Sequence, residues 1–151
     1  MNAKRAILGL ALLLSLVVFT FAVHASSSDE ISLFDFKERA IAYIAEDRTI
    51  YLWDGKPVAY LDGQSKDGLD IYGFNGKHLG WFKGGIIYDH EGDVVGGIRE
   101  VFKTVPELEP IKGLKELKPL KSLKELRPLK PLFSKQWAEL PLKFFLNEGA
   151  D

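Results

Sequence analysis

The sequence predicts an all-β protein in which four sequential β-hairpins form a pseudo-fourfold closed arrangement, followed by an extended, polyproline-II-like amphipathic tail. Two observations predict this fold class. A short unit of aromatic, turn and aliphatic residues recurs four times between residues 32 and 98, and a three-residue leucine period with interspersed prolines follows. We divide the chain into a signal peptide (1–25), a four-hairpin β domain (26–100), a triplet-repeat extended segment (101–133) and a short apolar C-terminal segment (134–151).

The first 25 residues have the layout of a secretory signal peptide. Lys4 and Arg5 precede an apolar run from Ala6 to Val23, and Ala25 supplies a small residue at a cleavage position. An uncleaved membrane anchor is the alternative, because the apolar run is close to spanning length. We therefore expect an exported protein, periplasmic or extracellular, that meets the membrane only through this segment. It contains no cysteine, so it folds without disulfides.

The charge of the chain is divided between its two halves. Residues 26–100 carry 8 basic and 14 acidic side chains, a net charge of −6, whereas residues 101–151 carry 10 basic and 7 acidic side chains, a net charge of +3. The net charge of the whole chain is −1, which argues against nucleic-acid binding because such proteins usually have a strong basic excess.

Each of the four units has the pattern of a β-hairpin. Asp54-Gly55 and Asn75-Gly76 are the dipeptides that two-residue type I′ turns prefer, and Glu91-Gly92 is a weaker version. Lys37-Glu38 has no glycine, so we expect another turn type in the first hairpin. A small residue recurs at one position of all four returning strands, which predicts close approach of the backbone there: Ala42, Ala59, Gly80 and Gly96.

Two stretches of the chain resemble a known family. IYLWDGKPVAYL at residues 50–61 and IYGFNGKHLGW at residues 71–81 are similar to the four-fold beta-flower family of exported bacterial proteins. The similarity covers roughly residues 32–98, and the Pro/Lys-rich tail is a further likeness. The resemblance implies pseudo-fourfold symmetry, and it implies no activity and no site residues.

The tail has a period of three residues, which fits neither a strand nor a helix but matches the three residues per turn of polyproline II. The first position of each triplet is leucine or isoleucine: Leu108, Ile111, Leu114, Leu117, Leu120, Leu123, Leu126, Leu129 and Leu132. The next position is mostly basic: Lys112, Lys115, Lys118, Lys121, Lys124, Arg127 and Lys130. A nine-residue repeat, opened by Pro110, Pro119 and Pro128, is superposed on the triplets.

Three interpretations of this tail are open. In the first, the leucines pack along the hairpins while the basic residues pair with the acidic half of the chain. In the second, the seven basic residues bind an anionic envelope polymer, a lipid headgroup or an acidic protein surface. In the third, the tail is a stiff spacer. The segment from Leu142 to Leu146 is strongly apolar, and it is either a plug that closes the core or an exposed anchor.

No catalytic motif is present. We expect no metal and no cofactor, and His78 and His90 would support an enzyme only if one of them lay near an Asp or Glu in an open pocket. We predict an exported, non-enzymatic binding or scaffold module of the cell envelope; the alternatives are an anion or membrane-surface binder acting through the basic tail and, third, a small hydrolase. The candidate ligand-binding rings are Tyr51, Trp53, Tyr72, Phe74 and Trp81.

Overall fold

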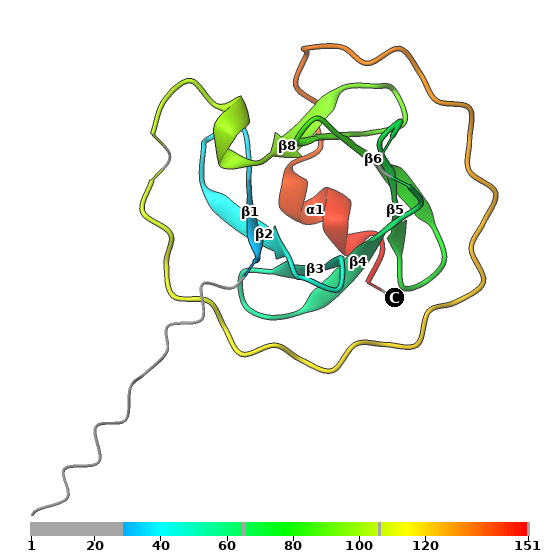
Figure 1. Ribbon diagram of the computed structural model, residues 1–151, viewed down its shortest axis with the longest axis horizontal. Helices are drawn as coiled ribbons and strands as arrows, with labels where there is room; N and C mark the ends of the chain where they lie inside the picture. The colour runs from blue at the N-terminus through cyan, green and yellow to red at the C-terminus, as the bar shows by residue number, and fades with distance from the viewer. Residues whose placement is uncertain (1–28, 65, 106, 151) are drawn as a thin grey trace, which may run out of the picture.

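The computed structural model describes residues 29–64, 66–105 and 107–150, so the predicted signal peptide lies outside the described residues. The chain forms a closed barrel of antiparallel strands that follow one another in chain order (Figure 1). The predicted all-β class is confirmed. The strands are β1 (Ile31–Phe34), β2 (Ala40–Ile44), β3 (Thr49–Leu52), β4 (Pro57–Asp62), β5 (Leu69–Gly73), β6 (His78–Lys83), β7 (Ile86–Tyr88) and β8 (Val94–Gly97).

The barrel interior is filled by large side chains that face small ones. Leu33 of β1 pairs with Ala42 of β2, and Ile50 of β3 pairs with Ala59 of β4. In the other half of the barrel the partners are glycines, since Ile71 pairs with Gly80 and Ile87 pairs with Gly96. An eight-stranded barrel has an interior just wide enough for side chains to fill. A β-carbon on Gly80 would lie 2.0 Å from Tyr88 O, and one on Gly96 would lie 2.8 Å from Phe34 O, so the glycines allow the neighbouring strand's backbone to approach closely.

The turns differ from the predicted type I′ geometry. Gly55 has a φ of +99°, but Asp54 before it does not have a positive φ, as a type I′ turn would require. The amide of Gly55 donates to Leu52 O and the amide of Leu52 donates to Lys56 O, with a β-bulge in the strand pair. This is a three-residue loop with a left-handed residue in its last position. The type I′ prediction was wrong because the bulge adds a residue that bends the strand.

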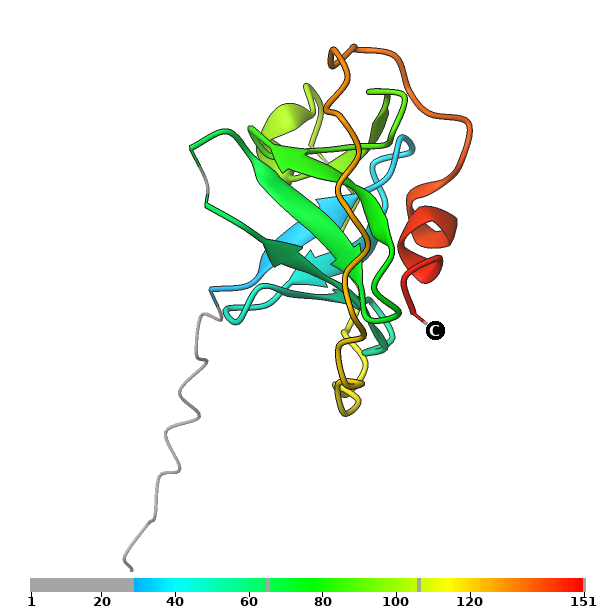
Figure 2. The same ribbon diagram turned by 90° about the vertical axis from the view of Figure 1, so that its right-hand side faces the viewer.

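One end of the barrel is closed by the helix α1 (Leu142–Asn147), which lies at the centre of the ring of strands in Figure 1 and to one side of the strands in Figure 2. Leu142, Phe145 and Leu146 are buried in the same cluster as the barrel interior. A β-carbon on Gly80 would lie 3.1 Å from Phe145 Cζ, and one on Gly96 would lie 2.8 Å from Leu142 Cδ2. The prediction that this segment closes the core is confirmed, and the glycines are what let the helix approach.

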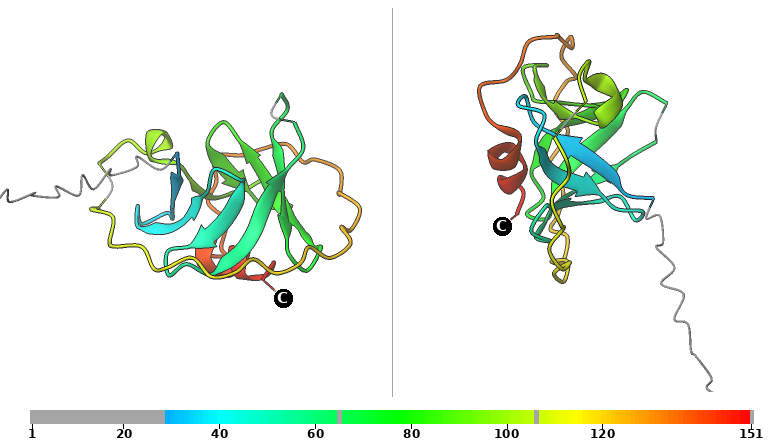
Figure 3. Two further views of the ribbon diagram at one scale, coloured as in Figure 1. Left: turned by 60° about the horizontal axis from the view of Figure 1, so that its bottom comes forward. Right: turned by 90° about the vertical axis from the view of Figure 1, so that its left-hand side faces the viewer.

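Between the short 3-10 helix η1 (Arg99–Val101) and α1, the chain runs around the outside of the barrel (Figures 1 and 3). We call residues 107–134 the belt; it contains no helix or strand. The amides of Gly113 and Glu116 donate to the carbonyls of Trp53 and Gly55 in the β3–β4 turn. Nine residues later, Ser122 and Glu125 donate to Phe74 and Gly76 in the β5–β6 turn, and Ser134 donates to Gly92 in the β7–β8 turn. Each nine-residue repeat of the belt therefore donates backbone hydrogen bonds to one hairpin turn.

Candidate functional site

The outer surface of the barrel carries the tyrosines that alternate with the interior residues. Tyr43 and Tyr51 form one buried cluster on adjacent strands, with Trp53 against it. Tyr60, Tyr72 and Phe74 form a second. The belt covers both clusters: Lys112 Nζ lies 4.3 Å from the Tyr43 ring centroid, and Lys121 Nζ lies 3.8 Å from that of Tyr60. An ammonium over an aromatic face is attracted by the ring quadrupole, so the rings help to hold the belt.

The five candidate ligand-binding rings do not meet at one place. Tyr51 and Trp53 each contact Tyr43, with ring centroids 5.5 and 5.9 Å away. Tyr72 and Phe74 each contact Tyr60, with centroids 6.3 and 5.6 Å away. Trp81 contacts His78, His90 and Phe133, and the His78 ring also contacts Tyr72. The structure therefore brings Tyr51 together with Trp53 around Tyr43 and Tyr72 together with Phe74 around Tyr60, and His78 lies between Tyr72 and Trp81.

The belt's basic side chains point back to acidic residues of the barrel. Lys112 and Lys115 lie 2.8 and 2.6 Å from the Glu30 carboxylate, and each other basic residue has its own partner. Those partners are Asp47 for Lys118, the Tyr60 ring for Lys121, Asp62 for Lys124, Asp70 for Arg127 and Asp67 O for Lys130. The predicted pairing between the two halves of the chain is confirmed.

The ion pairs shift the titration of the carboxylates. Burial alone would raise the pKa of Asp47, but hydrogen bonds from Lys118 and Thr49 lower it to about 2. The hydrogen bond from Lys124 lowers the pKa of Asp62, and burial opposes it only in part. These groups are exposed or partly exposed to solvent, so each ion pair contributes little to stability by itself. The belt is held by the number of such contacts and not by any single one.

The leucines of the belt face away from the barrel. The nine Leu and Ile side chains from Leu108 to Leu132, which we call the leucine stripe, are 92–99% exposed. The interpretation that the leucines pack along the hairpins is therefore wrong. The physical reason is the surface beneath the belt, which offers carboxylates and aromatic faces that suit lysine.

A second site lies where β5, β6 and the β7–β8 turn meet. His78 Nε2 lies 3.2 Å from Asp70 Oδ1, and His78 Nδ1 lies 3.0 Å from His90 Nε2. The two imidazole planes are 12° apart and their centroids are 5.2 Å apart, so the rings meet end to end. A carboxylate only accepts hydrogen bonds, so His78 donates from Nε2 to Asp70 and accepts from His90 at Nδ1. His90 Nδ1 is then left as an acceptor.

This Asp70–His78–His90 chain is anchored from several sides. The His78 side chain is fully buried, whereas His90 is exposed. Burial lowers the pKa of His78, and its hydrogen bond to Asp70 opposes that shift. The belt contributes two contacts, because Arg127 pairs with Asp70 Oδ2 at 3.1 Å and Glu125 Oε1 accepts from the His78 amide.

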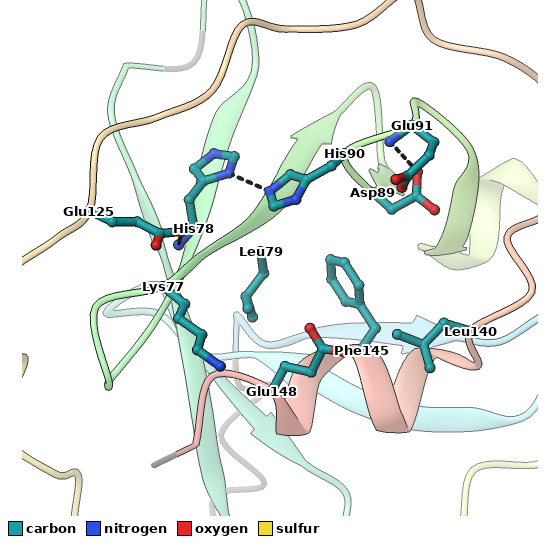
Figure 4. Close-up of a pocket in the computed structure, with 10 residues that line it drawn as sticks. All are labelled: Lys77, His78, Leu79, Asp89, His90, Glu91, Glu125, Leu140, Phe145 and Glu148. Carbon is teal, nitrogen blue, oxygen red and sulfur yellow. Dashed lines mark hydrogen bonds between the residues drawn. The ribbon is translucent and has the colours of Figure 1, made fainter.

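A cavity of about 350 Å³ opens beside the two histidines (Figure 4). The geometric condition for an enzyme, a histidine near an Asp in an open pocket, is therefore met by His78 and Asp70. Its apolar wall is formed by Leu79, Leu140 and Phe145, over which the imidazoles lie in Figure 4. Its charged wall contains Lys77, Asp89, Glu91, Glu125 and Glu148. With neutral histidines these side chains carry a net charge of −3, so the cavity has a negative potential.

The family model described as "4-fold beta flower protein" matches residues 31–146. The chain belongs to the 4-fold beta flower family. The matched residues include the whole barrel, the belt and α1 up to Leu146. No curated protein and no solved structure matches the chain.

Sequence reasoning on this beta-flower chain missed Asp70 as the partner of His78. Asp70 lies in β5, opposite Trp81 of β6. After the following pair, Ile71 with Gly80, a bulge shifts the register so that Tyr72 meets His78. The residue spacing alone therefore does not bring Asp70 to His78, and only the bulged register does.

Among residues 29–64, 66–105 and 107–150, no group of three or more His, Asp or Glu side chains is arranged to hold a metal ion, and no helix there is long and apolar enough to cross a bilayer.

Proposed function

We propose that this protein is an exported, non-enzymatic binding and scaffold module of the cell envelope, and that the leucine stripe is its binding surface. The occupant to which we commit is a second copy of the same chain. Export rests on the signal-peptide layout of residues 1–25. The binding role rests on one observation, the near-complete exposure of nine regularly spaced apolar side chains.

The leucine stripe is large for a surface without a partner. Burying a Leu side chain contributes about 1.5–3 kcal/mol at about 25 cal/mol per Å², which corresponds to about 60–120 Å² for each residue. Nine such residues present roughly 500–1,000 Å² of apolar surface, whereas the largest patch on a typical monomer is about 300–600 Å². Patches of that size usually mark an interface.

The belt conformation supports a preformed surface. We infer that the belt is a polyproline-II-like segment, in which three residues per turn place successive leucines about 9 Å apart on one face. If four hairpins surround a pseudo-fourfold axis, their turns are equivalent binding sites for the belt. The contacts of the belt with three of these turns recur every nine residues, which supports this arrangement. Because the barrel already holds the belt, docking a partner costs little further conformational entropy.

A second copy fits this surface for two reasons. The stripe repeats nearly the same side chain at a constant interval, so an arc of the stripe laid antiparallel against the same arc of a second copy is self-complementary, as a twofold interface requires. The basic side chains that would repel a like-charged copy are turned inward onto carboxylates and rings. The same contacts weaken the alternative that these basic residues bind an anionic polymer, because that polymer would have to displace intramolecular partners.

The test is the oligomeric state of the mature chain, residues 26–151, measured by sedimentation velocity between 1 and about 100 μM, a range typical of weak interfaces. We expect self-association that is lost when Leu117, Leu120 and Leu123 are replaced together by Gln. The matched control replaces Lys118, Lys121 and Lys124 by Gln and keeps the association. A wild-type chain that stays monomeric throughout overturns the proposal.

The other occupants are outcomes of the same experiment. Co-sedimentation of a monomeric chain with phosphatidylcholine vesicles, abolished by the leucine changes, would replace the second copy by a lipid surface. Association with anionic envelope polymer that is lost in the lysine control and kept in the leucine variant would favour the basic-tail alternative instead. Both results contradict the proposal as stated.

A further inference from the structure

The Asp70–His78–His90 chain and its cavity are separate from the leucine stripe and play no part in the proposed self-association. We propose that this cavity binds a primary ammonium group on a short apolar stem, with His90 Nδ1 as the hydrogen-bond acceptor and the surrounding carboxylates as counter-charges. The proposal stands on three features of the cavity: the acceptor, the charge and the apolar wall.

The acceptor is fixed by the hydrogen bonds behind it. The Asp70 carboxylate can only accept, so His78 donates to it and carries its proton on Nε2. His78 Nδ1 is then an acceptor, so His90 donates to it and carries its proton on Nε2. The ionic contact from Arg127 holds the Asp70 carboxylate in place. This arrangement leaves the unprotonated Nδ1 on the one exposed member of the chain, His90, which lines the cavity.

The charge of the cavity selects a cation. Glu91 and Glu148 line it, and neither side chain has a hydrogen-bond or ionic partner among the described residues. Asp89 and Glu125 add negative charge, although their oxygens accept amide hydrogen bonds from Glu91 and His78, respectively. Lys77 is the one opposing cation in the lining, so an anionic ligand would meet four carboxylates for each ammonium.

The apolar wall sets the shape of the ligand. Leu79 and Phe145 are buried on the side of the cavity below the imidazoles, and Leu140 completes that side (Figure 4). Pockets that bind small molecules commonly combine such a wall with a few convergent polar groups. A stem of a few methylene groups would lie on this wall while its ammonium group faces His90, Glu91 and Glu148.

The probe is n-butylammonium chloride, titrated into the mature chain at pH 8 and followed by amide chemical shifts of the residues around the cavity. We expect saturable binding centred on His90 and Glu148. Tetramethylammonium has the charge but no N–H donor, so it should bind at least tenfold more weakly, because a hydrogen bond to or from a charged group contributes about 1.5–3 kcal/mol. n-Butanol, which has the stem without the charge, should not saturate.

Three variants separate this site from non-specific attraction. His90→Phe removes the acceptor on an exposed ring and should lower affinity at least tenfold, whereas Glu148→Gln should lower it several-fold. Lys77→Gln removes the opposing cation and should raise affinity.

Equal binding of butylammonium and tetramethylammonium, unchanged binding in His90→Phe, or no saturation in the wild type overturns the proposal. The variant with Leu117, Leu120 and Leu123 replaced by Gln tests whether the two sites are independent. It should lose self-association and keep ammonium binding. The backbone spectrum of each variant shows that the barrel is intact.

Discussion

Glu38 occupies the position of the first turn that glycine occupies in the others. Its φ is +59°, whereas Gly55, Gly76 and Gly92 have φ values between +89° and +99°. The amide of Glu38 donates to Asp35 O, which is the contact that Gly55 makes with Leu52. A side chain with a β-carbon pays about 1–2 kcal/mol for this left-handed conformation. The first turn therefore has the same geometry as the rest, with a strained residue in the glycine position.

Replacing Glu38 by Gly should relieve this strain. Glu38→Ala is the matched control because it removes the same side chain, including the contact with Thr104, and keeps the β-carbon. We expect Glu38→Gly to be more stable than Glu38→Ala by about 1 kcal/mol in the free energy of unfolding, measured by urea denaturation. Equal stability of the two variants would mean that the backbone at this turn relaxes to a negative φ.

At the scale of elements, α1 and the belt show what a sequence pattern can and cannot decide. The apolar run from Leu142 to Leu146 predicted a plug, because a short, strongly apolar segment has few other ways to leave water. The triplet period of the belt predicted separate leucine and lysine stripes, and both exist. It did not predict which stripe faces the barrel, since that depends on the tyrosines and carboxylates that strand alternation exposes beneath it.

Two adjacent rings of α1 provide the test at this scale. Phe145 is buried against the barrel interior, whereas Phe144 is 63% exposed. We expect Phe145→Ala to lower the free energy of unfolding by about 3–5 kcal/mol, the usual cost of deleting a buried ring, and Phe144→Ala to change it by less than about 0.5 kcal/mol. Thermal melts of both variants give the comparison. If Phe145→Ala does not fold, Phe145→Leu should show a smaller loss, and equal effects at the two positions would contradict the role of α1 as a plug.

For the molecule as a whole, the small net charge conceals an acidic barrel and a basic belt that partly neutralise one another. The belt contacts are ion pairs, cation–aromatic contacts and isolated backbone hydrogen bonds, whereas the barrel is closed by strand pairing around an apolar core. Ion pairs at the surface weaken in salt, because the Debye length falls from about 10 Å at 0.1 M to about 3 Å at 1 M. Apolar burial does not weaken in this way, so the two layers should differ in their response to salt.

Amide hydrogen exchange measures this difference directly. At low salt, we expect protection at the belt amides that donate to the turns, including Gly113, Glu116 and Ser122, although no helix or strand contains them. The amides of Leu114 and Leu123 make no hydrogen bond among the described residues and serve as the fast-exchanging reference. Raising NaCl to 1 M should speed exchange at the donating belt amides together, because one local opening frees them all, and leave the barrel amide of Ile50 unchanged. Belt donors that exchange as fast as the leucine amides at low salt would show that the belt is not held, and salt-sensitive exchange at Ile50 would show that the barrel depends on the belt for its closure.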